Sequence, residues 1–469
     1  MKPVIESAEV ADRLRMIEAW IESLMHKKFM PGMSVGVLYD RELVWARGFG
    51  LADVESRIPA TPQTIYRIAS ITKTFTATAI MQLRDRGLLQ LDDPVCRHLA
   101  WFRFHNRFPE APEITLRHLI THTSGLPRES PFPYWNDFKF PTREVMIESL
   151  NGQENAFPSE TRWKYSNLAL SIAGEVVAAV SGQPYHEYIH EHILEPLGME
   201  STSVFLPEGH RSRLAVGYGQ RRADGSRHIM PFSDLRGLAP AGNISSTVED
   251  LARFISFQFS DGQAGGAQVL KESTLREMHR VQWLAPDWKS GRGLGFRIRR
   301  DEGRVLCGHG GSVSGYRSQI LFAPEEKVGV VCLVNADDAD AGTYADRIMR
   351  WMAPTIVRAV SPPPEIKKVN PAWERYVGKY RNQWSDTQIM LAGGELVMFD
   401  PSDEDLFAGM ARLEPVEGHV FRMVGEEGLM SIGEKVLFEM GEDGKPLRVR
   451  IGATYVYPVS SWMDEIKEI

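Results

Sequence analysis

Cysteine is scarce in this sequence, with only Cys96, Cys307 and Cys332 among 469 residues. Their spacing matches no metal-ligand pattern, and an odd number does not suggest a disulfide framework. The longest apolar run, VGVVCLV at 328–334, fits a buried strand and is far too short to span a bilayer. The N-terminal residues also lack the apolar core of a signal peptide. We therefore expect a cytoplasmic protein with no membrane partner.

An excess of positive charge is missing as well. The 54 basic residues are outnumbered by 61 acidic ones, which gives a formal net charge of −7, and the sequence has no basic stripe. We therefore expect no nucleic acid partner. The chain does have 43% hydrophobic and 25% charged residues, which is typical of a globular protein, and 469 residues are enough for two or three domains.

The order of strand-like and helix-like segments divides the chain. Strand-like runs occur near the start and again shortly before residue 335, with mostly helices and loops between them. We therefore expect one domain over 1–360 whose sheet draws on both ends of that segment. The stretch SPPPEIKKVNP at 361–371 carries four prolines, which is typical of a linker. Beyond it, 372–469 alternates short strands with tight turns, as in a small all-β barrel or sandwich.

One short motif, Ser70-Ile-Thr-Lys73, contains the residue types of a nucleophile and its base. A serine hydroxyl is a weak nucleophile unless a base lies within hydrogen-bond reach. Positions i and i+3 lie on one face of a helix, so Lys73 can point at Ser70. A helix N-terminus and burial both lower the pKa of a lysine, which favours a neutral, basic amine. The alternative is that Ser70 only caps the helix and Lys73 is solvated.

Two further motifs favour catalysis over helix capping. Tyr165-Ser-Asn167 follows a turn and opens an apolar helix. His309-Gly310-Gly311 lies at the edge of a predicted strand, where small residues let a substrate backbone approach. Three separate motifs in this order indicate catalysis more strongly than any one of them.

With these motifs the chain resembles the penicillin-recognising serine hydrolases related to class C β-lactamases, which include esterases, D-aminopeptidases and DD-carboxypeptidases. Further matches are ITLRHLITHTSGLP (114–127), EPLGMESTSV (195–204), PAGNISSTVEDLARF (240–254) and GLGF (293–296). The resemblance implies an α+β fold of the β-lactamase/transpeptidase type. In it an antiparallel sheet is flanked by helices, and the site lies in the cleft between the sheet and an all-helical lobe. Residues 372–469 resemble the lipocalin-like C-terminal domains of some members.

The resemblance also implies a role for the first two motifs. Ser70 is the expected acylated nucleophile. Lys73 and Tyr165 are the expected pair that moves its proton, and either of them could be the primary base. Asn167 is expected to hydrogen-bond the acyl-side amide of the substrate.

The third motif departs from the family pattern. His309, Gly310 and Gly311 stand where many relatives have Lys-Thr-Gly, and in β-lactamases that lysine helps to bind the carboxylate of the drug. An unperturbed histidine, with a pKa of about 6.5, is mostly neutral at pH 7, so we expect weaker recognition of penicillins that recovers towards pH 6. The backbone N–H groups of Ser70 and Ser312 are the expected oxyanion hole.

The expected function is that of a serine hydrolase that acts through an acyl-enzyme on small esters, amides or peptides. We expect weak β-lactam turnover at most and no cofactor, while the choice between hydrolysis and acyl transfer stays open. The C-terminal domain is a candidate module for assembly into a homo-oligomer.

Three features of the sequence leave alternatives to this function. His186-Glu187-Tyr-Ile-His190 matches the helix of zinc peptidases, although surface histidines on a structural helix explain it better. Gly32-Met-Ser34-Val-Gly36 matches a nucleophile elbow, but its serine lies inside a strand-like run instead of between a strand and a helix. The last alternative is a non-catalytic penicillin-binding or sensor protein that keeps the three motifs.

Overall fold

The computed structural model describes residues 4–259, 263–264, 267–361, 370–401, 410–425 and 431–462. They belong to two compact units, Met1–Ser361 and Pro362–Ile469, and each is described by itself. Most of the predicted linker, 361–371, lies outside the described residues.

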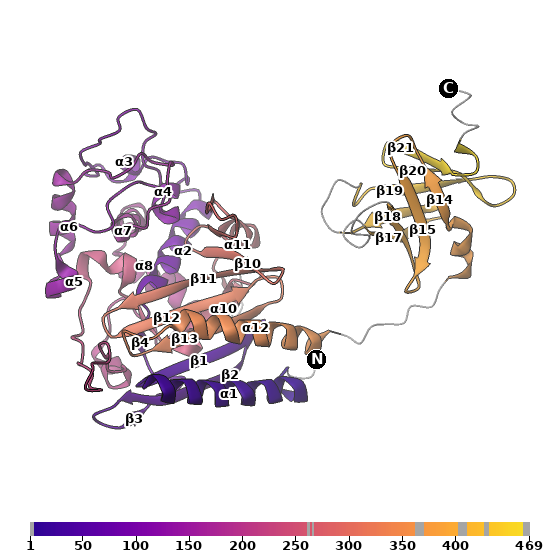
Figure 1. The fold of residues 1–469 in the computed structure, drawn as a ribbon. Coiled ribbons are helices and arrows are strands. Elements are labelled where there is room, and N and C mark those ends of the chain that lie inside the picture. Colours follow the sequence, from indigo (N-terminus) through magenta and orange to yellow (C-terminus); the bar gives the residue numbers. More distant parts are fainter. Residues whose placement is uncertain are drawn as a thin grey trace. The chain divides into compact units, whose positions relative to one another are not determined.

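The first unit is built on a nine-stranded sheet in the order β3-β2-β1-β13-β12-β11-β10-β9-β8, with antiparallel neighbours (Figure 1). Its strands are β1 (Gly32–Tyr39), β2 (Glu42–Asp53), β3 (Ile58–Pro59), β8 (Trp283–Leu284), β9 (Ser290–Arg292), β10 (Arg297–Asp301), β11 (Arg304–Val313), β12 (Tyr316–Ala323) and β13 (Val328–Val334). In the middle of the sheet Val35 of β1 lies opposite Cys332 of β13. This pairing confirms that the sheet draws on both ends of the unit.

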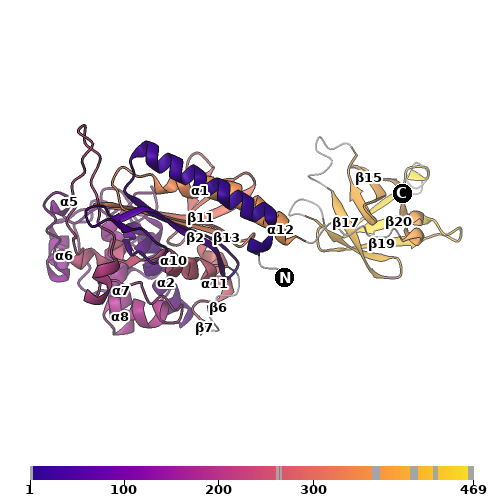
Figure 2. The same cartoon turned by 90° about the horizontal axis from the view of Figure 1, so that it is seen from below.

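Two long helices, α1 (Ala8–Lys28) and α12 (Ala341–Val360), run along one face of the sheet (Figures 1 and 2). Strand alternation turns Met33, Val35 and Val37 of β1 towards these helices, where they join one apolar cluster with both. Trp20 of α1 contacts Tyr344 and Trp351 of α12, with ring centroids 5.3 and 5.0 Å apart. The periodic apolar face of each helix therefore accounts for its position on the sheet.

The other face of the sheet carries the helical lobe (Figure 1). Its helices are α2 (Thr72–Asp85), α3 (Val95–His98), α4 (Leu116–Thr121), α5 (Tyr134–Asp137), α6 (Arg143–Ser149), α7 (Asn167–Ser181), α8 (Tyr185–Ile189), α9 (Ala239–Gly242), α10 (Val248–Phe257) and α11 (Glu272–Met278). Two short ribbons, β4 (Tyr66–Arg67) with β5 (Ser245–Ser246) and β6 (Gln263–Ala264) with β7 (Ala267–Gln268), complete the unit. Within the described ranges, no helix has both the length and the apolar composition needed to cross a bilayer.

Helix α2 lies in the centre of this side, because every residue from Thr72 to Leu83 is buried. Phe75 stacks on Phe254 of α10 with ring centroids 4.0 Å apart. A helix buried on all sides is held by its neighbours more than by its own propensity. The start of α2 is therefore rigidly placed against the sheet.

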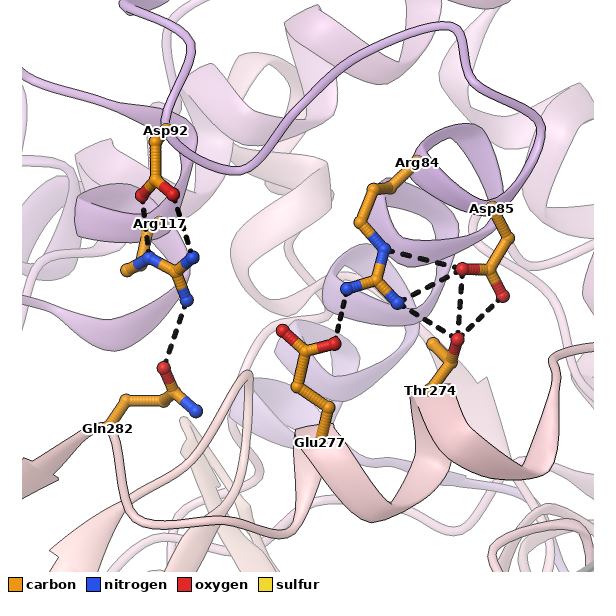
Figure 3. Close-up of polar contacts among 7 residues, drawn as sticks. All are labelled: Arg84, Asp85, Asp92, Arg117, Thr274, Glu277 and Gln282. Carbon is orange, nitrogen blue, oxygen red and sulfur yellow. Dashed lines mark hydrogen bonds and ion pairs between the residues drawn. The ribbon is translucent and has the colours of Figure 1, made fainter.

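The far end of α2 is fixed by polar contacts to α11 (Figure 3). Arg84 donates to Asp85 at 3.0 Å and to Thr274 Oγ1 at 2.9 Å, and it also pairs with Glu277. Thr274 Oγ1 in turn donates to the Asp85 carboxylate at 2.8 Å. The Arg84 and Asp85 side chains are largely buried, so each charge depends on its partners in this cluster.

The second unit is a closed barrel in which each strand pairs with the next along the chain. Its strands are β14 (Gly378–Arg381), β15 (Asp386–Ala392), β16 (Glu395–Phe399), β17 (Ala411–Glu417), β18 (Val420–Val424), β19 (Lys435–Met440), β20 (Pro446–Ile451) and β21 (Thr454–Pro458). Pairing of β21 with β14 closes the ring around an apolar core that includes Ile389, Phe421 and Phe438. The expected α+β domain followed by a small all-β barrel is thereby confirmed.

Candidate active site

Ser70 lies in the short 3₁₀ turn Ala69–Ile71 that leads into α2. Ala69, directly before it, has a left-handed backbone with φ of 49°, a conformation that costs a residue with a Cβ about 1–2 kcal/mol. Two bonds hold this turn from outside: Ser318 Oγ of β12 donates to the Ile68 carbonyl at 2.8 Å, and the Ile68 N–H donates to the Ile244 carbonyl at 3.0 Å. The surrounding structure therefore imposes a backbone that brings Ser70 to the cleft.

Lys73, one turn into α2, is only 1% exposed. Its Nζ lies 3.0 Å from Ser70 Oγ and donates to the Ala241 carbonyl at 2.5 Å. Burial lowers the pKa of Lys73, and the nearby hydroxyl of Tyr165 opposes part of this shift. A buried amine with a lowered pKa and a free lone pair can accept the proton of the serine.

Tyr165 reaches the same oxygen from the segment just before α7, with its hydroxyl 2.7 Å from Ser70 Oγ. Its ring lies against that of His122, with centroids 4.5 Å apart, and Lys73 Nζ lies 4.9 Å from the ring centre. His122 Nδ1 accepts the Ser166 N–H at 3.2 Å, and burial keeps the pKa of His122 well below its ordinary value. A neutral His122 therefore orients the tyrosine without adding a charge.

Strand β11 supplies the opposite wall, with His309, Gly310, Gly311 and Ser312 along the cleft. Strand β10 pairs with β11 only as far as Gly308, so β11 is an edge strand from there onwards. An edge strand offers backbone groups to an extended ligand. The sequence-predicted placement of this motif at a strand edge agrees with the structure.

His309 is neutral in this wall. Burial, with help from the charge of Lys73, lowers the pKa of His309 to about 3. Part of the ring faces the cleft and is reached by solvent, which moderates the shift without changing its direction. Nδ1 lies 2.7 Å from the Gly310 carbonyl and so carries the proton in the neutral ring. The expected protonation of His309 near pH 6 is therefore wrong, because an unperturbed pKa does not apply to an enclosed ring beside a lysine.

These groups share one cleft of about 1170 Å³. It contains Ser70, Tyr165, Asn167 and the 309–312 wall, while Lys73 lies beneath it and lines an adjoining cavity of about 110 Å³. The structure thus brings together all eight residues predicted from sequence. Their chemical roles stay predictions.

The cleft also contains residues that the sequence reasoning missed. Glu129 accepts a hydrogen bond from Asn167 Nδ2 at 2.6 Å, and Arg128 lies over the Tyr165 ring, 5.1 Å from its centre. Both directly follow the HTSGLP segment, 122–127, whose resemblance to the family points to no particular role for them. Arg292 lines the adjoining cavity with its guanidinium 4.3 Å from the centre of a Trp163 ring. No local spacing links these side chains to the three motifs.

Residues 17–350, about 70% of the chain, match the family model described as Beta-lactamase. The chain belongs to the beta-lactamase family. The expected membership in a serine hydrolase family related to β-lactamases is therefore confirmed.

The alignments with individual relatives cover only part of each protein. Beta-lactamase-like protein 2 of Dictyostelium discoideum is 32% identical over 302 residues, which are 63% of this chain and 54% of that protein. Protein flp of Staphylococcus aureus strain MW2 is 28% identical over 336 residues, 69% of this chain and 63% of that protein. The chain thus spans just over half to less than two thirds of the length of these relatives.

Two solved structures support the fold of this beta-lactamase family member. The octameric penicillin-binding protein homologue from Pyrococcus abyssi superposes with a TM-score of 0.65 at 25% identity, covering 94% of this chain and 99% of that one. A D-stereospecific amidohydrolase from Streptomyces sp. gives 0.60 at 24% identity, covering 71% of this chain and 97% of that one. At 24% identity, the similarity to the amidohydrolase shows a shared fold only.

The residues of the two rival motifs lie elsewhere in the family fold. Ser34 is buried within β1, where its hydroxyl contacts the Thr61 carbonyl at 2.8 Å and the Tyr66 hydroxyl at 2.9 Å. α8 ends at Ile189, and a π-helical turn, His190–Leu194, follows it, so the continuous α-helix of a zinc peptidase is interrupted at its second histidine. Among the described residues, no three His, Cys, Asp or Glu side chains gather as a metal site.

Proposed function

We propose that the protein hydrolyses small esters and amides through an acyl-enzyme on Ser70. The observation that carries the proposal is the contact of one hydroxyl with two proton carriers, Lys73 Nζ at 3.0 Å and Tyr165 OH at 2.7 Å. A serine at the mouth of a large cleft with a buried amine beneath it has the geometry of an activated nucleophile.

Acylation begins when Ser70 Oγ attacks the carbonyl carbon of the substrate. The serine proton passes to Lys73 or Tyr165, and the carbonyl oxygen becomes negative in front of the N–H groups of Ser70 and Ser312. Collapse of the tetrahedral intermediate breaks the bond to the leaving group, which takes the proton. Water then attacks the acyl-enzyme with the same two groups acting in reverse.

The ring of His309 is neutral, and this affects which substrates the cleft binds well. Because Nδ1 carries the proton and donates it to the Gly310 carbonyl, the ring offers a carboxylate neither a donor nor a positive charge, whereas an uncharged ester loses nothing. We propose that neutral esters and amides have a higher kcat/KM than penicillins for this reason.

The test is loss of labelling and turnover in matched variants. Ser70→Ala is expected to lower kcat on p-nitrophenyl acetate by about 10⁴–10⁶-fold and to abolish labelling by a fluorophosphonate probe. Lys73→Ala and Tyr165→Phe are expected to fall nearly as far, and the double variant no further, because the three groups act as one unit. Full turnover by Ser70→Ala would refute the proposal.

Two further assays address the alternatives. A chelator that abolishes activity, with stoichiometric zinc in the purified protein, would favour the metallopeptidase at His186 and His190. Stoichiometric penicillin binding without any turnover of esters or amides would favour the sensor.

We propose that the barrel serves assembly of the protein into a homo-oligomer. The similarity to an octameric homologue over 94% of this chain, barrel included, supports this role. A variant that ends at Ser361 is expected to keep fluorophosphonate labelling and to become smaller in light scattering by more than the mass of the barrel. A truncated protein with the same number of subunits would contradict the proposal.

A further inference from the structure

Among the three carboxylates that line the cleft, those of Glu129, Asp337 and Asp340, that of Glu129 contacts the acyl-side residue Asn167. Its side chain is 19% exposed, and it accepts from Asn167 Nδ2 at 2.6 Å, from the Tyr134 hydroxyl at 2.6 Å and from Arg128 Nε at 3.3 Å. Burial and Glu129 itself raise the pKa of Tyr134, so its hydroxyl stays protonated and donates. The carboxylate is therefore held in place by three donors.

This contact fixes the orientation of the Asn167 amide. A carboxylate has only acceptor atoms, so the asparagine atom 2.6 Å away must be the NH₂ nitrogen. The Oδ1 of Asn167 is then the atom left for a substrate, and within the described parts of the chain no donor reaches it. The acyl-side wall thus presents acceptors from both Glu129 and Asn167.

Because Glu129 and Asn167 present acceptors, this wall favours a substrate group that donates hydrogen bonds. The carbonyl oxygen of an acylamino group, as in a penicillin side chain or an N-acetyl amino acid, would meet the two acceptors without a donor between them. A protonated amine has three N–H donors and a positive charge, which satisfies both acceptors and the carboxylate charge.

The charge of Arg128 opposes a cation at this position. Its side chain is 64% exposed, and its guanidinium is directed over the Tyr165 ring. Solvent screens an exposed charge strongly, whereas the largely buried Glu129 is screened less. The less hydrated charge, that of Glu129, therefore decides the preference.

We propose that the acyl-side pocket binds a protonated amino group, so that the preferred substrates are amino-acid esters, amino-acid amides or peptides with a free N-terminus. This inference rests on the proposed acyl-enzyme function and names its substrate class. Glu129 binds the ammonium, and Asn167 Oδ1 accepts a second N–H from it. The remaining contacts of the carboxylate keep both acceptors in position.

The experiment compares alanine p-nitroanilide with N-acetyl-alanine p-nitroanilide, using both enantiomers of each. The wild type is expected to favour the free amine by at least about tenfold in kcat/KM, the effect of one charge-assisted hydrogen bond. Glu129→Gln is expected to lower the ratio of kcat/KM for the free amine to that for the N-acetyl compound by about 10–100-fold. Glu154→Gln, an exposed glutamate outside the cleft, is the matched control and should change neither substrate.

A pH profile gives a second readout. If Glu129 had only a structural role, the preference for the free amine would not depend on the protonation of that amine. The ratio of kcat/KM for the free amine to that for the N-acetyl compound should fall above about pH 8, where an α-amino group loses its proton. This measurement uses the wild type and stays decisive even if Glu129→Gln does not fold.

Three outcomes would overturn the inference: preference of the wild type for the N-acetyl compound, an equal loss on all substrates in a folded Glu129→Gln protein, or a ratio that is flat across pH 6–9. Any of these would leave the proposed function intact as long as Ser70→Ala is inactive on p-nitrophenyl acetate. Conversely, an active Ser70→Ala enzyme would remove the proposed function on which the inference rests.

Discussion

Gly311 offers the sharpest test of how the β11 wall is placed. A Cβ at this position would lie 2.1 Å from the Ile68 carbonyl oxygen and 2.2 Å from Ser318 Oγ. A normal carbon–oxygen contact is more than 3 Å, so Gly311→Ala has to move β11 or the turn before Ser70 by about 1 Å. The Ile68 oxygen belongs to the backbone, so no side-chain rotation can relieve the clash.

The neighbouring glycine gives the matched control. A Cβ at Gly310 would meet Gln319 Oε1 at 2.8 Å, which is the end of a flexible side chain that can turn away. Both substitutions reduce the conformational freedom of the unfolded chain by the same amount, so the difference between them isolates the native clash. The two variants differ only in the face of β11 on which the methyl group lies.

The expected cost follows from this displacement. Overpacking against backbone destabilises a protein by about 1–3 kcal/mol, and a 1 Å misplacement of catalytic groups lowers turnover by about 100-fold. We expect Gly311→Ala to show both losses relative to Gly310→Ala, measured by urea unfolding and by turnover of p-nitrophenyl acetate. A Gly311→Ala protein as stable and as active as Gly310→Ala would refute the placement of β11 against Ile68.

Three further predictions concern individual side chains of the first unit, His309, Lys73 and Arg84. His309→Lys should raise the penicillin-to-ester ratio of kcat/KM by about 10–100-fold, whereas lowering the pH to 6 should leave the wild-type ratio unchanged, since the pKa of His309 is about 3. Lys73→Met should abolish turnover yet stabilise the protein at pH 7 by about 1–3 kcal/mol in urea unfolding. Burial lowers the pKa of Lys73, so between the folded and unfolded pKa values the unfolded chain binds one proton more than the folded chain. The stability of the wild type therefore rises with pH in that window. The stability gained by Lys73→Met should accordingly shrink towards pH 10. Arg84→Ala should destabilise by about 1–3 kcal/mol through the unpaired Asp85, with labelling of Ser70 retained below the lowered melting temperature.

Much of the fold could be predicted from the order of strand-like and helix-like segments. Apolar runs at both ends of the first unit indicated a shared sheet, and β1 and β13 are indeed neighbours. The short strands after residue 372 indicated a small all-β module, and they close into a barrel. Both inferences rest on local periodicity, which the sequence displays directly.

The candidate site could be predicted only in part. Ser70 and Lys73 lie three residues apart where the 3₁₀ turn leads into α2, so their spacing was sufficient to pair them. The family pattern then added Tyr165, Asn167 and the His309–Ser312 segment. The zinc-peptidase interpretation failed to anticipate the π-helical turn that begins at His190, because the pattern fixes residue types and not the helix geometry.

The sequence by itself was sufficient to single out Ser70 as the candidate nucleophile, to pair it with Lys73 and to indicate the architecture, because these inferences rest on local spacing and periodicity. Only the tertiary structure decided the left-handed backbone at Ala69, the burial that lowers the pKa of Lys73, and the neutral state of His309. It also decided that Glu129 turns the Asn167 amide, a contact between residues 38 positions apart. Such properties depend on which distant atoms exclude water or come within hydrogen-bond range, and no local pattern encodes those distances.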